Sequence, residues 1–146
     1  MPKFYVSKPD DFNDEVKVST VFIEADGKIL FLLRKKCKLS PNTWGVPGGK
    51  IEKDETPVEA LLRELWEEIK LQSSPKDITF IQSLYVHHPK MNYELYLFRW
   101  ILSSMPVVTL DHREHTDYIW QPINKVSELP LLEGQLEAFL YVYPSN

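Results

Sequence analysis

The chain has 146 residues, of which 43% are hydrophobic, 26% charged and 12% aromatic. This length and composition exclude a disordered or fibrous protein, so we expect a single domain over residues 1–146. Seventeen Lys and Arg against 21 Asp and Glu leave a formal charge of -4, which argues against nucleic acid or an anionic membrane as the main partner.

Cysteine content and the search for targeting signals bear on the bonding of the chain and on its location in the cell. Cys37 is the only cysteine, which excludes an intramolecular disulfide and a cysteine-based zinc site. The first sixteen residues contain no apolar run that resembles a signal peptide, and no later segment reaches transmembrane length. We therefore expect a cytoplasmic protein with no membrane partner, as a monomer or a homodimer.

The first predicted elements form a β-hairpin. Residues 16–24 read as a strand, Asp26-Gly27 is a hairpin turn signal, and residues 28–34 (KILFLLR) read as the returning strand. The segment that follows, up to about residue 55, contains prolines and glycines without a sustained period. This pattern predicts a long irregular connection, and long ordered loops in compact domains are often functional.

A helix is predicted from Pro57 to about Ile69. Thr56 is placed as its N-cap, and Glu59 falls three residues later, as in a capping box. Apolar residues at helical spacing predict that one face packs against a core. These residues are Val58, Leu61, Leu62, Leu65 and Ile69.

The remaining elements indicate the fold class. Residues 77–88 and 93–103 read as two strands joined across PKMN, residues 117–123 read as another strand, and residues 131–143 read as a second helix. This order predicts an α/β (α+β) fold with a mixed β-sheet flanked by helices. We expect Trp44 to be buried beside the glycine-rich loop and Trp120 to pack under the last helix.

Three carboxylates lie close together on the first predicted helix. Glu64, Glu67 and Glu68 point in one direction, and the like-charge pair Glu64 and Glu68 costs ~0.2–0.5 kcal/mol in an isolated helix. A divalent cation makes such a cluster favourable, because Mg²⁺ takes hard oxygen ligands such as carboxylates and phosphates. A solvated acidic surface is the alternative interpretation.

The spacing around these acids resembles the Nudix box. Gly49, Glu55, the run Arg63-Glu64-Leu65-Trp66-Glu67-Glu68 and the apolar Leu71 stand at the spacing of that box. Lys70 departs from the pattern, which has glycine there. TWGVPGG and ILFLLRK, which come before the box, also resemble MutT-like members. The chain thus resembles a Nudix hydrolase, and the resemblance implies an α/β/α sandwich.

The resemblance also implies the roles of the box acids. Glu67 and Glu68 would bind Mg²⁺, with Mn²⁺ as a possible substitute. Glu64 would be a further metal ligand or the base that activates water. Arg63 would orient the acids.

Three further positions follow from the resemblance. The carbonyl of Gly48 would be a metal ligand, and Glu55 would pair with Arg63, although a charge favoured by the helix dipole is an alternative for Glu55. Glycine suits a left-handed helix C-cap, and a side chain there costs about 1 kcal/mol. Lys70 therefore implies either a different helix end or tolerated strain, with the metal site intact.

Outside the box, Glu114 is the candidate for an additional metal ligand or the general base, in competition with Glu64. His115 and Asp117 are alternatives, and a polar loop before an edge strand would explain all three. Arg34 and Trp44 are candidates for substrate binding. Further candidates for contact with substrate are Tyr85, His87, His88, Tyr93 and Tyr96, for which core packing or solvent exposure is the alternative.

The implied reaction is divalent-metal-dependent hydrolysis of a nucleoside diphosphate linked to another group X. A small (d)NTP-type nucleotide that yields NMP and pyrophosphate is the preferred substrate. GDP-sugars, pterin triphosphates and ADP-ribose are alternatives. A nucleotide-binding module without catalysis and an RNA-end hydrolase are the other hypotheses, and the net charge of -4 counts against the second.

Overall fold

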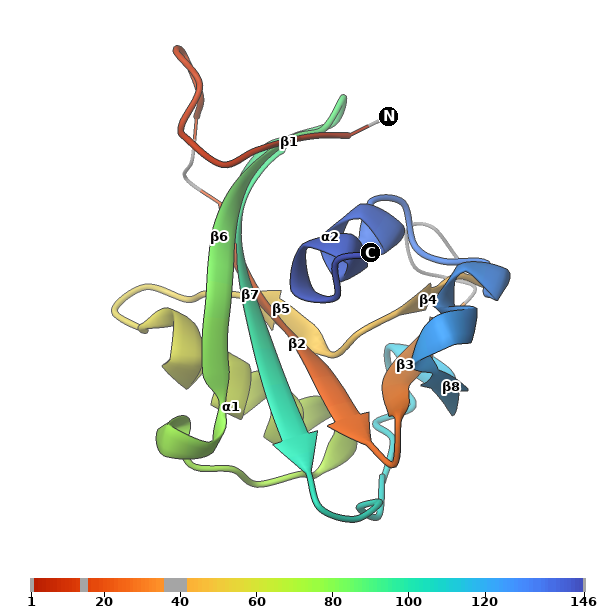
Figure 1. Cartoon of the computed structure of the whole chain (residues 1–146). Helices are drawn as coiled ribbons and strands as arrows, with labels where there is room; N and C mark the ends of the chain where they lie inside the picture. The colour runs from red at the N-terminus through yellow and green to blue at the C-terminus, as the bar shows by residue number, and fades with distance from the viewer. Residues whose placement is uncertain (1, 14–15, 36–41, 146) are drawn as a thin grey trace.

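The computed structural model describes residues 2–13, 16–35 and 42–145. Cys37 and the lysines on either side of it lie outside these residues. Eight strands form one sheet in the order β1-β6-β7-β2-β3-β4, while β5 pairs with β2 and β8 pairs with β3 (Figure 1). The strands are β1 (Lys3–Tyr5), β2 (Lys17–Ala25), β3 (Lys28–Arg34), β4 (Trp44–Gly45), β5 (Gly48–Lys50), β6 (Thr79–His87), β7 (Asn92–Leu102) and β8 (His115–Pro122).

The pairing of the strands makes the sheet mixed, as the sequence predicts. The hairpin of β2 and β3 turns at Asp26-Gly27, and β6 and β7 form a second antiparallel pair. β2 and β7 run parallel from Lys17 opposite Glu94 to Ala25 opposite Leu102. A parallel pair needs a crossover, and the chain between β2 and β7 supplies one that contains the long helix.

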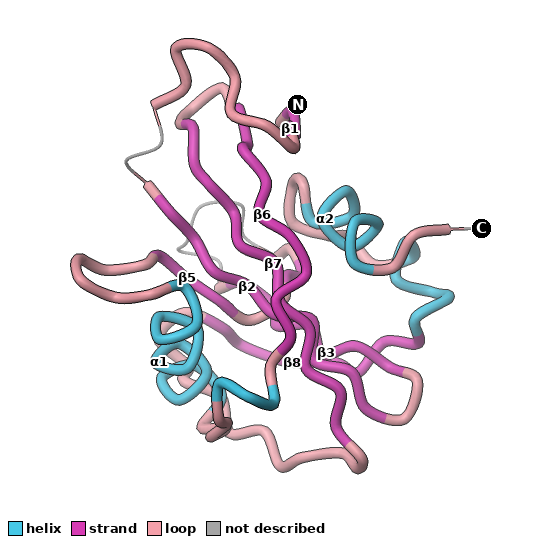
Figure 2. The backbone as a smooth tube through the Cα atoms, turned by 60° about the vertical axis from the view of Figure 1, so that its left-hand side comes forward, coloured by secondary structure: helices cyan, strands magenta, loops and turns pink. Residues whose placement is uncertain are grey.

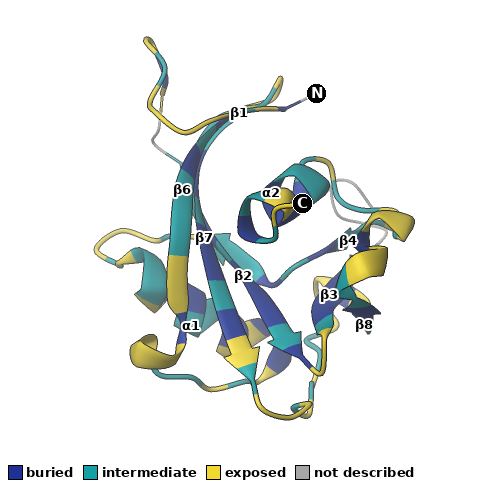
Figure 3. Ribbon diagram, in the orientation of Figure 1, coloured by how far each residue is buried: buried dark blue, intermediate teal, exposed yellow. Residues whose placement is uncertain are grey.

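Two helices cover opposite faces of this sheet. Helix α1 (Pro57–Ile69) lies on one side and α2 (Gln135–Val142) on the other (Figures 1 and 2). Because side chains alternate along a strand, Val21 and Ile23 of β2 pack on the α1 side, whereas Phe22 between them packs on the α2 side. All three are buried, and in Figure 3 much of β2 has the dark blue of buried residues. The predicted α/β/α sandwich is confirmed.

The local signals for α1 are also confirmed. Thr56 accepts a hydrogen bond from the backbone N–H of Glu59, and the Glu59 side chain accepts one from the N–H of Thr56. The Ser19 hydroxyl of β2 donates to the carbonyl of Pro57 at 2.7 Å. The first turn of the helix is therefore fixed both by its own cap and by the sheet.

Several features differ from the prediction. The short strands β1 and β5 were not expected, nor were two 3₁₀ turns, η1 (Pro75–Asp77) and η2 (Ile123–Glu128). The prediction for Trp120 is wrong, because its side chain packs with the core on the α1 side and not under the last helix. Trp44 is half-buried in β4, against the α2-side core. Within the described residues, no helix has the length and apolar character needed to span a membrane.

Candidate active site

The acidic face of α1 opens into a cavity of about 360 Å³. Glu64, Glu67 and Glu68 line it from the helix, His115 lines it from the first position of β8, and Glu114 lines it from the turn just before that strand. A second cavity, of about 400 Å³, shares four of these residues and extends toward the glycine turn at β5. The structure therefore brings the predicted box acids and Glu114 together around one space.

Glu68 is the most enclosed of these acids. It is 6% exposed, and its Oε1 accepts a hydrogen bond from the backbone N–H of Gly48 at 2.9 Å. Its Oε2 lies 3.8 Å from Nδ1 of His115. Burial raises the pKa of Glu68 well above its ordinary value, and the carboxylates of Glu64 and Glu114 raise it further. A positive charge beside Glu68 is needed for its carboxylate to be ionised at neutral pH without a large cost in free energy.

Arg63 links the acids on its side of the site. Its Nε and one terminal nitrogen bond both oxygens of Glu55, at 2.8 and 3.0 Å. Its other terminal nitrogen lies 3.0 Å from Glu64 Oε1. These hydrogen bonds lower the pKa of Glu55 to about 2, whereas burial dominates at Glu64 and raises its pKa. The pairing of Glu55 with Arg63 is thus present, and Glu64 is held in a fixed direction.

Close packing requires glycine at both positions where the box begins, Gly48 and Gly49. A Cβ on Gly49 would lie 2.3 Å from Oε1 of Glu64. A Cβ on Gly48 would lie 2.2 Å from the carbonyl oxygen of Ser19. The backbone of this turn can lie against the acids and against β2 only without side chains. The role of the Gly48 carbonyl as a metal ligand stays a prediction.

Backbone hydrogen bonds hold Glu114 and His115 close to the acids of α1. The last carbonyls of a helix have no partner within the helix. Here the carbonyl of Glu68 accepts from the N–H of Asp111 at 2.9 Å, and the carbonyl of Ile69 accepts from the N–H of Thr109 at 3.2 Å. The N–H of Lys35 then donates to the carbonyl of Glu114 at 2.9 Å. The loop before β8 is thereby tied to both the helix and β3.

Two residues of this loop were missed from the sequence. Asp111 and Arg113 line the first cavity, and the guanidinium of Arg113 makes a bidentate contact with the Asp111 carboxylate. This contact lowers the pKa of Asp111. The signal available in the sequence was the charged run DHRE directly before His115.

The other candidates lie in different places. Arg34 and Gly48 line the second cavity, so they share a space with Glu64 and Glu68. Tyr85 packs edge to face against Phe12, with ring centroids 5.4 Å apart.

Both predicted histidines of the β6–β7 hairpin line a separate cavity. This cavity lies where β6 and β7 meet, and His88 there has its Nε2 3.6 Å from Glu133. Neither cavity at the acids is lined by Trp44, His87 or His88. Their contact with substrate stays a prediction.

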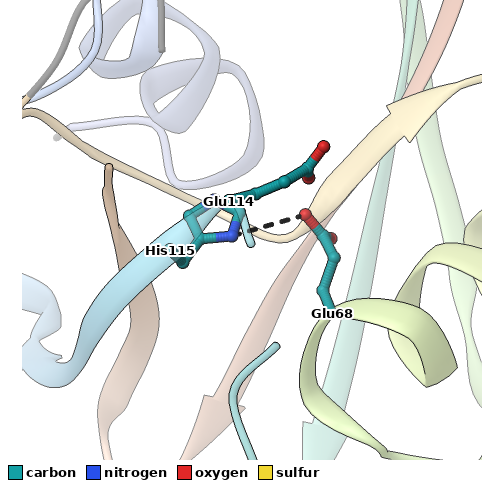
Figure 4. Close-up of side chains that lie close together, drawn as sticks. All are labelled: Glu68, Glu114 and His115. Atoms are coloured by element: carbon teal, nitrogen blue, oxygen red, sulfur yellow. Dashed lines mark ion pairs between the residues drawn. The ribbon is translucent and has the colours of Figure 1, made fainter. Parts of the chain in front are cut away.

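The donor set of the site fits a divalent cation. Glu68, Glu114 and His115 each offer one ligand atom, and these atoms lie within 4.8 Å of one another (Figure 4). Carboxylate oxygens are ligands for Mg²⁺ and Mn²⁺. Bound here, such a cation would offset the repulsion among the acids, neutralise phosphate charge and lower the pKa of a bound water.

An α/β/α sandwich with a carboxylate cavity at the end of its long helix is a scaffold suited to metal-assisted chemistry on phosphates. The family model of the NUDIX domain matches residues 14–141, and the chain belongs to this family. It is a Nudix hydrolase, a class of enzyme that uses divalent metals to hydrolyse nucleoside diphosphate derivatives.

Individual relatives agree with this assignment. A CTP pyrophosphohydrolase of Escherichia coli (strain K12) is 30% identical over 129 residues, which cover 86% of this chain and 91% of that protein. A dihydroneopterin triphosphate diphosphatase of Haemophilus influenzae is 26% identical and covers 86% of this chain and 85% of its own length. The crystal structure of a MutT NUDIX hydrolase from Burkholderia pseudomallei has a TM-score of 0.75 at 21% identity, over 87% of this chain and 97% of that one.

Proposed function

We propose that this enzyme is a pyrophosphohydrolase that cleaves a nucleoside triphosphate to NMP and pyrophosphate, with Mg²⁺ as its cation and Mn²⁺ as a possible substitute. The observation that carries the proposal is the buried carboxylate of Glu68, surrounded by Glu64 and Glu114 at the edge of the cavity. Buried carboxylates this close together stay ionised at neutral pH only with a positive charge beside them, and without one they take up protons.

Each acid has a proposed part in this chemistry. Glu67 and Glu68 would hold the cation on the α1 side, and Glu114 would hold it from the start of β8. Glu64 lines both cavities and is a candidate for the base that takes a proton from water; Glu114, which also lines both, is the alternative base if it does not bind the cation. Arg63 would keep Glu64 in position through its 3.0 Å hydrogen bond.

Two observations support a triphosphate as the substrate. Two of the relatives that match most of this chain are named for CTP and for dihydroneopterin triphosphate. The two adjoining cavities provide an acidic part for cations with phosphates and, in the second cavity, a part where Val46 and Leu132 lie with Arg34 and Lys50 for the remainder of a nucleotide. Pterin triphosphates, GDP-sugars and ADP-ribose are the alternatives within the same reaction.

The proposed partner is a small nucleotide, and the net charge of -4 supports this choice over a nucleic acid. A cytoplasmic location and a monomeric or homodimeric state are part of the same proposal.

The test is the release of phosphate and pyrophosphate from nucleoside triphosphates, pterin triphosphate, GDP-sugars and ADP-ribose, each with Mg²⁺ and with Mn²⁺. We expect pyrophosphate and NMP from a triphosphate, and we expect chelator to abolish the release. Glu68→Gln should lower kcat by roughly 10²-fold or more because it removes a charge that binds the cation.

The matched control is Glu128→Gln, which neutralises an exposed glutamate outside both cavities and should leave kcat unchanged. Binding of nucleotides without turnover in either metal would contradict the proposal and favour a nucleotide-binding module.

A further inference from the structure

His115 is the residue of this site that a purely carboxylate metal centre does not explain. It lies outside the box, at the first position of β8. Its side chain is 9% exposed, and its Nδ1 is shielded from solvent. Figure 4 shows that this nitrogen points toward the carboxylate of Glu68, with Glu114 beside it. A buried imidazole among acids has either a structural or a ligand role.

The distances allow these three residues to share one ion. Bonds from a divalent metal to imidazole nitrogen and to carboxylate oxygen are about 2.0–2.2 Å, so two ligands of one ion lie up to roughly 4.4 Å apart. Nδ1 of His115 and Oε2 of Glu68 are 3.8 Å apart, and all three ligand atoms lie within 4.8 Å of one another. Glu114 is exposed and can turn to close the remaining distance.

The backbone fixes two of the three ligands in advance. Glu68 is held through its side chain by the N–H of Gly48, and through its carbonyl by the N–H of Asp111. His115 pairs with Arg34 in the register of β3 and β8. A preformed arrangement of this kind loses little conformational entropy when a ligand binds.

We infer that His115 is a metal ligand, so that Glu68, Glu114 and His115 form a mixed nitrogen and oxygen site. Imidazole favours first-row transition cations, whereas Mg²⁺ favours oxygen ligands alone. One cation position of this enzyme would therefore prefer first-row transition cations over Mg²⁺, and Mn²⁺, the member of that series with the weakest affinity, serves as the probe. The inference rests on the proposed function, because it assigns a ligand and a preference to the same site.

The direct test uses Mn²⁺ alone with the whole chain and no nucleotide. Electron spin-echo spectra of bound Mn²⁺ are recorded for protein with natural histidine and for protein with ¹⁵N-labelled histidine. We expect ¹⁴N modulation that changes to the ¹⁵N pattern on labelling. Identical spectra from the two samples would overturn the inference, and this comparison needs no variant that could fail to fold.

A pair of variants tests the preference for the cation. His115→Gln should weaken Mn²⁺ binding by about tenfold or more, while Mg²⁺ binding changes by roughly twofold at most. His112→Gln is the matched control, because His112 is exposed, lies three residues before His115 in the loop that leads into β8, and lines neither cavity. Equal loss of both cations in His115→Gln would contradict the inference and indicate that His115 only pairs with Glu68.

These results separate the inference from the proposed function. Hydrolysis with Mg²⁺ but no histidine nitrogen at Mn²⁺ would overturn the inference and leave the proposed function standing. Histidine nitrogen at Mn²⁺ without hydrolysis of any substrate would support the inference and overturn the proposed function.

Discussion

At the scale of single residues, the position of one carboxylate depends on the absence of one side chain. Gly49 and Glu64 are fifteen residues apart in the sequence, yet a Cβ on Gly49 would lie 2.3 Å from Oε1 of Glu64. Arg63 holds that same oxygen from the other direction at 3.0 Å. The carboxylate thus has little room to rotate, which is the condition for a precisely oriented base or ligand.

Gly49→Ala should therefore lower activity more than it lowers stability. The added methyl group displaces the Glu64 carboxylate, and we expect kcat to fall by about tenfold or more. The free energy of unfolding should change by roughly 1 kcal/mol or less, because Glu64 can move toward the cavity. Steady-state kinetics and urea denaturation measure the two effects.

Gly27→Ala is the matched control and should behave in the opposite way. Gly27 has a φ of +71° and open space around its Cβ position, so alanine there costs about 1 kcal/mol of backbone strain without touching the site. Its kcat should equal that of the wild type. If Gly49→Ala retained full activity, the proposed orientation of Glu64 by close packing would be wrong.

The residues of the box could be predicted because their spacing is local. Glu64, Glu67 and Glu68 share one helix, so helical geometry alone places them on one arc. His115 could not be placed in this way. Its distance to Glu68 depends on the loop that Thr109 and Asp111 attach to the end of α1, and no periodicity in the sequence encodes those backbone hydrogen bonds.

At the scale of elements, the C-terminal end of α1 has a strained backbone at Lys70, and a side-chain contact of the same residue offsets part of that strain. Lys70 adopts φ 56° and ψ 37°, the left-handed conformation that glycine favours, so the helix ends as a glycine-capped helix would. Its N–H donates to the carbonyls of Leu65 and Trp66, and its Nζ lies 5.0 Å from the centre of the Trp66 ring. A cation over an exposed aromatic ring contributes ~0.5–1 kcal/mol, which offsets part of the strain.

Two substitutions at Lys70 distinguish the cost of the left-handed backbone from the gain of the contact with the Trp66 ring. Lys70→Ala keeps the left-handed strain and removes the contact with the Trp66 ring, whereas Lys70→Gly removes both. We expect the glycine variant to be more stable than the alanine variant by about 1 kcal/mol. The measurement is urea denaturation of both proteins, with kcat expected to stay within about twofold because Lys70 supplies no carboxylate. Equal stability of the two variants would show that the left-handed C-cap carries no strain.

The elements that the sequence predicts are those with enough residues to show a period. Helix α1 and strands β2, β3, β6, β7 and β8 all have seven or more residues. Strands of two or three residues, such as β4 and β5, have no period and are formed by pairing with β3 and β2.

The face of the sheet on which a strand residue packs also cannot be predicted from the neighbouring sequence alone. Ile119 and Trp120 alternate as expected along β8, but the arrangement of the two helices decides that Trp120 faces the α1 side.

At the scale of the whole molecule, the ionised acids of the site lower the stability of the fold when no cation is bound. Two apolar cores on the two faces of the sheet hold the chain together, and the acids lie at the end of α1 beside one of them. Burial raises the pKa of Glu68 and of Glu64 in the folded chain, so ionisation of these groups at neutral pH destabilises the folded state without a cation. The contribution of Arg63 and Glu55 has the opposite sign, since the pKa of Glu55 is lowered to about 2.

The dependence of stability on pH follows from these signs. A raised pKa in the folded state gives stability that is complete below the ordinary value of 4.5 and is lost as pH rises through the folded pKa. In the presence of chelator, the free energy of unfolding of the wild type should therefore fall between pH 5 and pH 8 relative to that of Glu68→Gln. The comparison with this variant cancels the groups that both proteins share, including Glu55.

A divalent cation should reverse the difference in the free energy of unfolding between the wild type and Glu68→Gln. Binding to the folded chain alone adds RT ln(1 + [L]/Kd), which is about 2.7 kcal/mol when the cation is at a hundred times its Kd. At pH 8 the wild type should regain stability of this order with Mn²⁺, whereas Glu68→Gln should gain much less because it has lost a ligand. Urea denaturation at the two pH values, with chelator and with Mn²⁺, measures all four states of each protein. If the free energies of unfolding of the metal-free wild type and of Glu68→Gln changed equally from pH 5 to pH 8, the buried carboxylate would not be the group that couples metal binding to folding.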